Sequence, residues 1–126
     1  MGMNKRQAGG FWEEEAAAYL QRAGVRITAR NFKCSRGEID IIGFHRDCLV
    51  FFEVKYRRDE SFGTGAEAVG VRKQERICRT ADVYLYRHPL PPQAGVRFDV
   101  VAVCGRKIEW LQGAFDYRRA GAWRRG

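Results

Sequence analysis

Residues 49–57, with the sequence LVFFEVKYR, constrain the fold more than any other segment. The pattern predicts a β-strand, whose side chains alternate between two faces. One face is apolar and carries Val50, Phe52, Val54 and Tyr56, whereas Phe51, Glu53, Lys55 and Arg57 share the other. A charged row is ordinary on an edge strand with one solvated face. It is also typical of an active-site strand, in which a metal-binding carboxylate lies beside a charge-stabilising amine. This segment alone leaves both interpretations open.

The size and composition of the chain predict a folded protein with a core of its own. A chain of 126 residues is long enough for one compact domain. The apolar content of 45% and the aromatic content of 13% are typical of globular proteins and exclude a disordered chain. We expect a single domain over residues 1–117, followed by a basic, flexible tail over residues 118–126.

The net charge of +8 suggests a class of partner. Most of the positive charge is arginine, whose guanidinium group binds phosphate in a bidentate manner, so nucleic acid is favoured. A compositional bias toward arginine explains the same charge without a partner. The sequence contains no apolar run of membrane-spanning length and no secretory signal, so we expect a cytoplasmic protein without a membrane partner.

The cysteines and histidines do not predict a metal site. The cysteines are spread widely and form no C-x-x-C pair, unlike the ligands of most zinc sites. The four are Cys34, Cys48, Cys78 and Cys104, of which the last three are expected to be reduced residues in or beside the core. His45 and His88 are isolated in predicted loops, without the partners that a catalytic base or a metal ligand requires.

The remaining pattern predicts an alternation of helices and strands. A helix is predicted over residues 11–23, ended by Gly24, and a second over residues 66–86, after a loop at 60–65. The predicted strands lie at residues 25–32, 37–44, 49–57, 96–103 and 107–111. The second and third strands are joined by about four polar residues, which is typical of an antiparallel hairpin. The order α-β-β-β-α-β predicts an α/β fold with a mixed central sheet flanked by helices.

The predicted hairpin brings two carboxylates together. In GEIDIIGF at residues 37–44, alternation puts Ile39 and Ile41 on one face and Asp40 on the other. Asp40 and Glu53 then lie roughly 5 Å apart if they share a face. Carboxylates that close repel each other and raise each other's pKa, and a divalent cation relieves the repulsion. Magnesium prefers such oxygen ligands, and Lys55 is placed to stabilise a nucleophile or a charged phosphate.

The first predicted helix offers a third carboxylate. Of the three glutamates at positions 13–15, only Glu13 is followed by apolar residues at i+3, i+4 and i+7, so it should face the sheet. An unpaired carboxylate there is unfavourable. A metal ligand and an acid placed favourably near a helix N-terminus are both consistent with this position.

This combination of Glu13, Asp40 and E-V-K at residues 53–55 resembles the PD-(D/E)-x-K nuclease signature. The chain also resembles the YraN family, small bacterial proteins similar to archaeal Holliday-junction resolvases with a restriction-endonuclease-like fold. The resemblance runs from about Gly9 to Phe115. Its blocks are WEEEAAAYLQRAG, N-F-x(4)-GEIDII, LVFFEVKYRR, AV-x(3)-KQ-x(2)-I-x(3)-A-x(2)-YL, RFDVVAV and IEWLQGAF.

The resemblance implies a restriction-endonuclease-like fold and a catalytic role for four residues. Asp40 and Glu53 fall on the metal-binding acids, which would hold Mg²⁺ or Mn²⁺. Glu13 falls on a helix glutamate that serves as a further ligand or orients water, and Lys55 falls on the lysine of the motif.

Two further blocks match the family with roles left open. Lys73 and Gln74 fit either phosphate contact or helix packing, and Arg97 and Asp99 fit either a functional pair or a structural ion pair. The residues expected to bind nucleic acid are Arg36, Arg57, Arg58, Lys73, Gln74, Arg118 and Arg119.

Three functions are therefore considered. The first is a metal-dependent endonuclease that hydrolyses DNA phosphodiester bonds, with branched or Holliday-junction DNA as substrate by resemblance and a homodimer as the expected assembly. The alternative is a non-catalytic nucleic-acid-binding protein that uses the same basic surface. The third is an adaptor whose charge is only compositional. The presence of all four site residues favours the nuclease.

Overall fold

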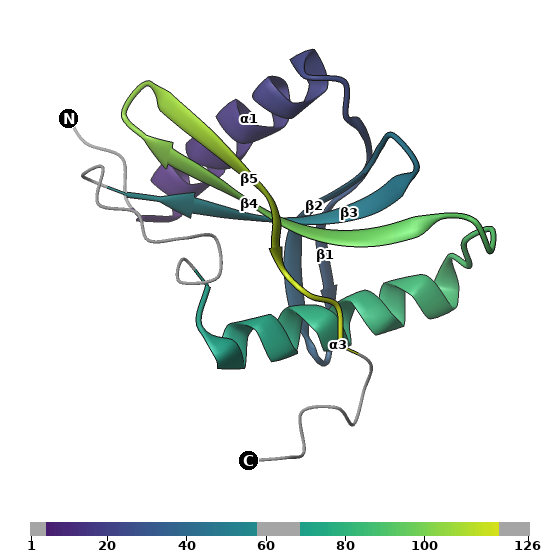
Figure 1. Cartoon of the computed structure of the whole chain (residues 1–126). Coiled ribbons are helices and arrows are strands. Elements are labelled where there is room, and N and C mark those ends of the chain that lie inside the picture. The colour runs from purple at the N-terminus through teal and green to yellow at the C-terminus, as the bar shows by residue number, and fades with distance from the viewer. Residues whose placement is uncertain (1–4, 58–68, 119–126) are drawn as a thin grey trace.

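The structure, a computed structural model, describes residues 5–57 and 69–118, with the side chains of the first range described from residue 10 onward. A five-stranded sheet lies between two helices (Figure 1). The elements are α1 (Lys5–Arg22), β1 (Arg26–Cys34), β2 (Gly37–His45), β3 (Cys48–Tyr56), α3 (Val71–Arg87), β4 (Gly95–Cys104) and β5 (Lys107–Phe115).

The sheet is mixed, with the strand order β1-β2-β3-β4-β5. β3 and β4 run parallel, and the other neighbouring strands are antiparallel. The predicted α/β class and the predicted β2–β3 hairpin are therefore confirmed. β3 is the central strand, so the interpretation of residues 49–57 as an edge strand is wrong. Its charged residues require another explanation.

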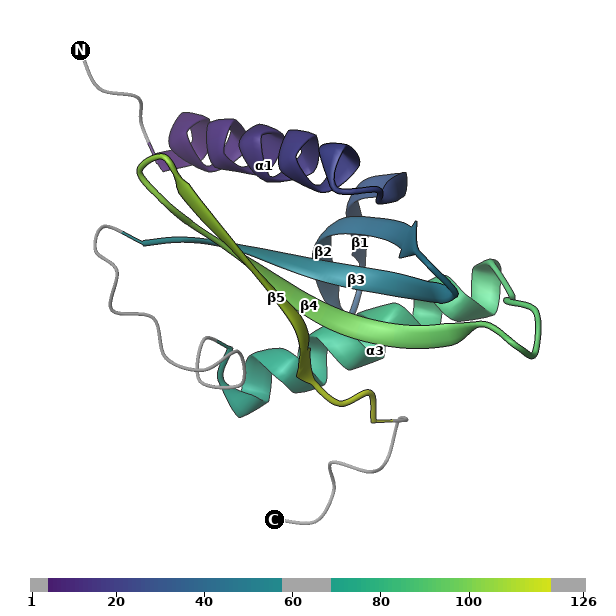
Figure 2. The same ribbon diagram turned by 45° about the horizontal axis from the view of Figure 1, so that its top comes forward.

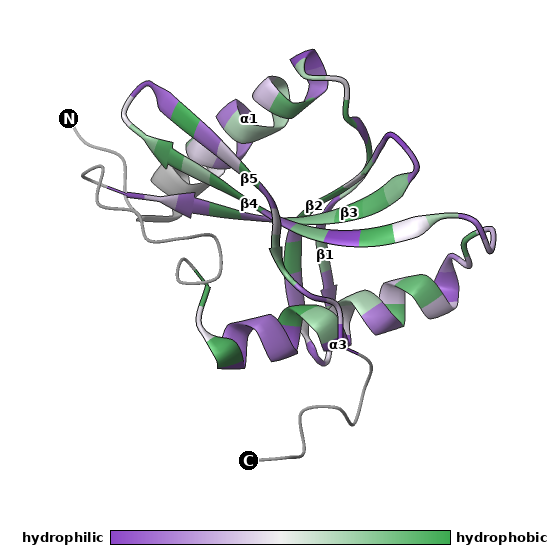
Figure 3. Ribbon diagram, viewed as in Figure 1, coloured by the Kyte–Doolittle hydropathy of each residue, from purple (hydrophilic) through white to green (hydrophobic). Residues whose placement is uncertain are grey.

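Each face of the sheet is covered by one helix, which is clearest in Figure 2. On one face, Ala16 and Leu20 of α1 belong to a buried cluster with Phe52. On the other face, Ile77 and Ala81 of α3 belong to a second buried cluster, which contains Phe51 of β3. Hydrophilic and hydrophobic residues alternate along α3, as expected of a helix with one face on a sheet (Figure 3). The predicted alternation along β3 is confirmed, because Phe51 and Phe52 pack in the clusters on opposite faces of the sheet.

The observed boundaries extend some elements and shorten others. α1 begins at Lys5, before the predicted start, and ends at Arg22, one residue before the predicted end. Gly24 caps the helix as predicted, because its φ of 98° lets the Val25 amide donate to the Leu20 carbonyl at 2.9 Å. α3 begins at Val71 instead of residue 66, because Gly70 is extended. The predicted loop 60–65 and the first residues of the predicted second helix, 66–68, lie outside the described residues. So does the predicted tail beyond Arg118.

β5 is longer than predicted and reaches Phe115. Gly113 has a φ of 61°, and the register between β4 and β5 shifts in this region, between Phe98 and Val100. The shift is a β-bulge, which accommodates the left-handed Gly113 and allows β5 to continue beyond it. The ring of Phe115 then stacks on Phe98 in the core, with the ring centroids 5.1 Å apart.

The predicted alternation along β2 is wrong at Asp40. Ile39 packs in the cluster under α3 and Ile41 in the cluster under α1, although residues two apart should share a face. Asn31 of β1 lies between the pairs that β1 forms with Ile39 and Ile41, and its φ is 52°. This left-handed residue interrupts the pleat, so the chain changes face beside Asp40.

β2 and β3 also separate at this point. Their pairing ends at Ile41 and Phe52. Beyond it, β2 continues against β1 as far as Gly37, and β3 continues against β4 as far as Tyr56. The two halves of the sheet diverge in both ribbon views (Figures 1 and 2). We call this divergence the fork.

All four cysteines are free. Cys78 of α3 is buried as predicted, and the other three are half-buried. Neither α1 nor α3 has the length and apolar character that crossing a membrane would need.

Gly43 provides a test of the close packing between β1 and β2. A Cβ atom at Gly43 would lie 2.8 Å from the Arg26 carbonyl oxygen and 2.9 Å from Val25 Cγ1. Gly43→Ala should therefore lower the free energy of unfolding by about 1–3 kcal/mol, as overpacking does. The same substitution at Gly10, an exposed position in α1 with no atom within 4 Å, should raise it by about 1 kcal/mol. Chemical denaturation measures both, and equal effects at the two positions would contradict the packing described.

Candidate functional site

A pocket opens at the fork, between the diverging strands and the first turns of α3. Its volume is about 220 Å³. The strands contribute the carboxylates of Asp40 and Glu53 and also that of Glu38, which pairs with Lys33 at 3.4 Å, and α3 contributes Lys73 and Arg76. Two of the acids predicted from sequence are thus brought into one cavity, together with two cationic side chains.

Asp40 occupies the place where the backbone pairing stops. The Val54 amide donates a hydrogen bond to Asp40 Oδ2 at 2.9 Å, so a side-chain carboxylate satisfies a backbone donor that no longer faces a paired strand. Asp40 is half-buried. The change of face beside Asp40 and the fork together orient this carboxylate.

Glu53 is a buried acid, with 8% of its side chain exposed. Its Oε1 forms an ion pair with Lys73 Nζ at 3.0 Å. Burial and then the charge of Asp40 raise the pKa of Glu53 to about 7, against the opposing influence of Lys73 and Lys55. Burial, together with the charge of Asp40, outweighs the attraction of the nearby ammonium groups.

Glu13 adds a third carboxylate on the far side of Asp40. It is half-buried, whereas Glu14 and Glu15 are exposed, as the helical pattern predicted. Its Oε1 is buried without a hydrogen-bond partner. Burial and then Asp40 raise the pKa of Glu13, and the charge of Arg30 lowers it. Asp40 therefore interacts with an acid from α1 and with an acid from β3.

These acids do not by themselves form a complete metal site. Within residues 5–57 and 69–118, no three His, Cys, Asp or Glu side chains are arranged as ligands of one ion. Magnesium is commonly bound by one or two carboxylates, with water and phosphate oxygens as its other ligands. The pair of Asp40 and Glu53 fits that smaller requirement.

Lys55 lies close to both Glu53 and Lys73. Burial and then the charge of Lys73 lower the pKa of the Lys55 ammonium, while Glu53 opposes the shift. Two lysines, one from β3 and one from α3, therefore flank the same carboxylate. The sequence predicted Lys55 in this role, but it did not predict the pairing of Glu53 with Lys73, because that contact depends on how α3 docks.

The neighbouring residue in the same block has a structural role. Gln74 Nε2 donates a hydrogen bond to the Val69 carbonyl at 2.8 Å, and its backbone amide donates to the Gly70 carbonyl at 2.9 Å. These bonds fix the chain that enters α3. The helix-packing alternative therefore describes Gln74, while Lys73 faces the acids.

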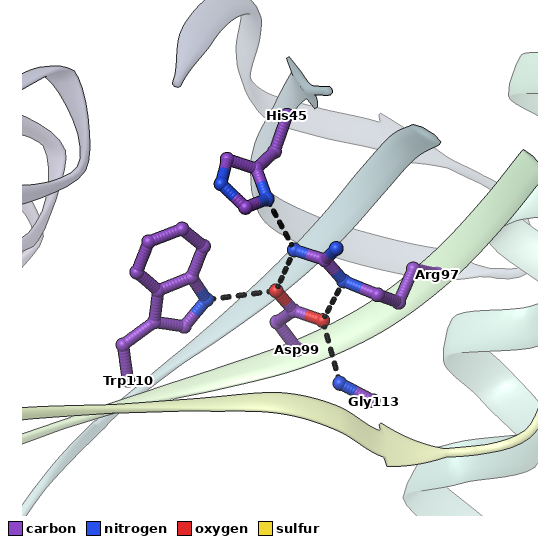
Figure 4. Close-up of polar contacts among 5 residues, drawn as sticks. All are labelled: His45, Arg97, Asp99, Trp110 and Gly113. Carbon is purple, nitrogen blue, oxygen red and sulfur yellow. Dashed lines mark hydrogen bonds and ion pairs between the residues drawn. The ribbon is translucent and has the colours of Figure 1, made fainter. Parts of the chain in front are cut away.

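Arg97 and Asp99 form the structural ion pair that was one of the two alternatives (Figure 4). The guanidinium donates through Nε and Nη2 to the two carboxylate oxygens, both at 2.9 Å. Trp110 Nε1 and the Gly113 amide donate to the same carboxylate at 2.7 and 2.9 Å. Asp99 is fully buried. Its hydrogen-bonding capacity is filled by the protein itself.

The prediction for His45 is wrong. It is the last residue of β2 instead of a loop residue, and it is buried. Arg97 Nη2 lies 3.0 Å from His45 Nδ1, and the imidazole packs against Trp110 (Figure 4). Strand β2 extends one residue further than its pattern indicated, because a turn of only two residues, Arg46 and Asp47, closes the hairpin.

The predicted nucleic-acid-binding residues are spread over the molecule. Arg36 is exposed beyond β1, Arg57 is exposed after β3, and Arg118 is exposed at the end of the described chain. Arg58 and Arg119 lie outside the described residues. Sequence reasoning missed Arg76, which lines the pocket. Its position three residues after Lys73 on a predicted helix was the available signal.

Comparison with known proteins identifies close relatives. The sequence profile described as "Uncharacterised protein family UPF0102" matches residues 12–103. A UPF0102 protein of Lachnoclostridium phytofermentans is 45% identical over 114 residues, which cover 90% of this chain and 97% of the relative. A UPF0102 protein of Photobacterium profundum is 45% identical, covering 86% of this chain and 90% of the relative. A third, from Vibrio campbellii, is 42% identical, covering 92% and 98%.

The raised pKa of Glu53 predicts how stability depends on pH. The unfolded glutamate ionises near pH 4.5, whereas the folded one holds its proton to about pH 7. The folded state binds more protons between these values, so the contribution of Glu53 is largest below pH 4.5 and is lost as pH rises through about 7. Glu53→Gln should therefore gain stability relative to the wild type, by about 1–3 kcal/mol, between pH 5 and pH 8. Thermal unfolding in chelator measures this difference.

Glu109→Gln, at an exposed position of β5, is the matched control and should change stability little. A difference between Glu53→Gln and the wild type that stays constant from pH 5 to pH 8 would contradict the raised pKa of Glu53.

Proposed function

The chain belongs to the UPF0102 family, which is the YraN family that its motifs resemble, and we propose that it is a metal-dependent nuclease that hydrolyses DNA phosphodiester bonds. One observation carries the proposal. Two crowded carboxylates, Asp40 and Glu53, share a pocket with cationic side chains on a protein of net charge +8. A protein that only binds phosphate gains nothing from acids placed beside it, because they repel the ligand.

Asp40 and Glu53 are the residues that would hold Mg²⁺ or Mn²⁺, with Glu13 as a further ligand or a group that orients water. Two features support the fit. Burial and the charge of Asp40 raise the pKa of Glu53, and Glu13 Oε1 is buried without a hydrogen-bond partner. The donors are oxygen atoms, which these ions prefer. When bound, the ion supplies Lewis-acid stabilisation of the phosphate and an activated water.

The cationic side chains have a separate task in this proposal. A phosphodiester that enters the pocket meets Lys73 and Arg76 from α3, with Lys55 close to Lys73. These groups offset the charge that develops on the phosphate during hydrolysis. Without substrate, Lys73 neutralises Glu53 and reduces the repulsion between the two carboxylates.

Branched DNA is the substrate that the resemblance favours within this proposal. Two strands exchanged at a junction must be cut symmetrically, and a homodimer with two-fold symmetry would present two equivalent pockets to them.

A second candidate is a non-catalytic nucleic-acid-binding protein. The observation in its favour is the ion pair of 3.0 Å between Lys73 and Glu53, which already partners the buried acid. The lack of a complete three-ligand group among the described residues points the same way. In this case the pocket stabilises the docking of α3, and only the basic surface contacts nucleic acid.

Asp40→Asn distinguishes the two candidates. An asparagine keeps an oxygen that accepts the Val54 amide, so the fold should be retained, with stability in chelator unchanged or raised by up to about 1 kcal/mol. Loss of the metal-binding charge should lower cleavage at least about a hundredfold, because metal stabilisation supplies several kcal/mol. Binding in chelator should persist. The assay uses four-way junction, flap, single-stranded and duplex DNA with magnesium, manganese or chelator.

Asp47→Asn, in the exposed β2–β3 turn, is the matched control and should cleave like the wild type. Full cleavage by folded Asp40→Asn would remove the metal-site assignment. Binding without cleavage of any substrate by the wild type would favour the second candidate.

A further inference from the structure

The pocket at the fork is the first of three hollows that follow α3. Arg76 lines both the pocket and a neighbouring groove of about 570 Å³. Arg36 and Arg79 line that groove and also a further one of about 440 Å³, which is bordered by Tyr86 and Arg87. The shared residues make the three hollows neighbours in one continuous path, from the candidate catalytic residues toward the end of α3.

The path is strongly basic. It is lined by five arginines, which we call the arginine track: Arg36, Arg72, Arg76, Arg79 and Arg87. Among the described residues, two carboxylates line the same grooves, those of Glu75 and Asp82. Glu75 is paired with Arg79 at 2.7 Å, and Asp82 accepts a hydrogen bond from the Tyr117 hydroxyl. Five arginines against these two carboxylates make the potential along the two grooves positive.

The arginine track has the geometry of a surface that follows a strand. Arg72, Arg76 and Arg79 have the spacing i, i+4, i+7, which places them on one face of α3. From Arg72 to Arg87 the helix rises about 22 Å, which accommodates several nucleotides. A row of guanidinium groups binds successive phosphates without reading their sequence.

Arg36 is held beside this helix by close packing of the next residue, Gly37. A Cβ atom at Gly37 would lie 3.0 Å from Thr80 Oγ1 on α3, so the β1–β2 turn and the helix approach with no space between them. Arg36 therefore contributes to the track from a different element.

An aromatic side chain lies at the far end of the path. Tyr86 is 87% exposed, more than the other exposed large hydrophobic side chains, and it borders the last groove with Arg87. An exposed ring beside arginines is the arrangement on which unpaired bases stack, whereas the bases of a duplex are already stacked on each other.

We propose that the arginine track binds the DNA strand that continues from the fork pocket, and that Tyr86 stacks on an unpaired base of this strand. The substrate class is then DNA with a single-stranded extension a few nucleotides from the cleaved phosphate. The inference rests on the proposed nuclease function for the position of that phosphate, but the binding it describes does not require cleavage.

The test measures binding of the full-length protein in chelator, where no cleavage interferes. Fluorescence anisotropy compares a blunt duplex with the same duplex carrying a single-stranded extension. The extension should tighten binding by the wild type. Tyr86→Ala should lose this gain, by roughly fivefold or more, and Tyr86→Phe should keep it. The wild type should bind an extension made of abasic nucleotides as weakly as Tyr86→Ala binds the normal extension. Tyr86→Ala should bind the abasic extension no more weakly than the normal one.

The arginines are tested by salt dependence. Arg36→Gln/Arg72→Gln removes two exposed members of the track and should reduce the slope of log affinity against log salt by about 1–2. The matched control is Arg46→Gln/Arg106→Gln, which removes two exposed arginines from the β2–β3 and β4–β5 turns. The β4–β5 turn lies beside α1, on the side of the sheet away from α3 (Figures 1 and 2). Thermal unfolding of every variant reports on its fold.

Equal losses in the track and control variants would overturn the proposal, and so would unchanged binding of the extended duplex by Tyr86→Ala or no DNA binding by the wild type. The expected binding pattern without any cleavage would keep the arginine track and remove the nuclease. Cleavage by the wild type, with binding by the track variants unaltered, would keep the nuclease and remove the arginine track.

Discussion

The hydrogen bond from the Val54 amide to Asp40 Oδ2 lies where β2 and β3 stop pairing, and the candidate site depends on it. A sheet that divides exposes backbone donors that must find other partners. Here a carboxylate accepts one of them and is thereby held at the mouth of the opening. The change of face along β2, opposite the left-handed Asn31, brings the same carboxylate between the acids of α1 and β3.

The central position of β3 explains why its charges interact so strongly. A strand covered by helices on both faces gives an acid little solvent, so burial raises the pKa of Glu53, and its ionised form attracts the nearby ammonium groups strongly. On an edge strand the same residues would be hydrated and screened. Docking of α3 supplies Lys73 and makes the buried acid tolerable, which links the stability of the core to the composition of the pocket.

The buried acid Asp99 and the acids at the fork differ in how fully the protein satisfies their hydrogen-bonding capacity. Asp99 accepts hydrogen bonds from Arg97, Trp110 and Gly113, so it has little remaining capacity for a ligand. At the fork, Glu13 Oε1 has no partner and Asp40 crowds Glu53. A folded protein usually satisfies its buried polar groups, and exceptions are found where function requires them. This contrast separates the structural ion pair from the candidate site.

The sequence by itself determined the element order and the alternation of faces along β3, because these follow from local periodicity, and one short hairpin indicated that Asp40 and Glu53 are near each other. The inward position of Glu13 followed from the helical spacing of its apolar neighbours. Tertiary structure decided the fork, the pairing of Glu53 with Lys73, the burial of His45 and the path along α3. Each depends on how separate elements dock, and on a pleat that one left-handed residue interrupts. The periodicity of a segment predicts its faces only if the neighbouring strand pairs with it regularly. It contains no information on where that pairing ends or where the neighbouring strand is irregular.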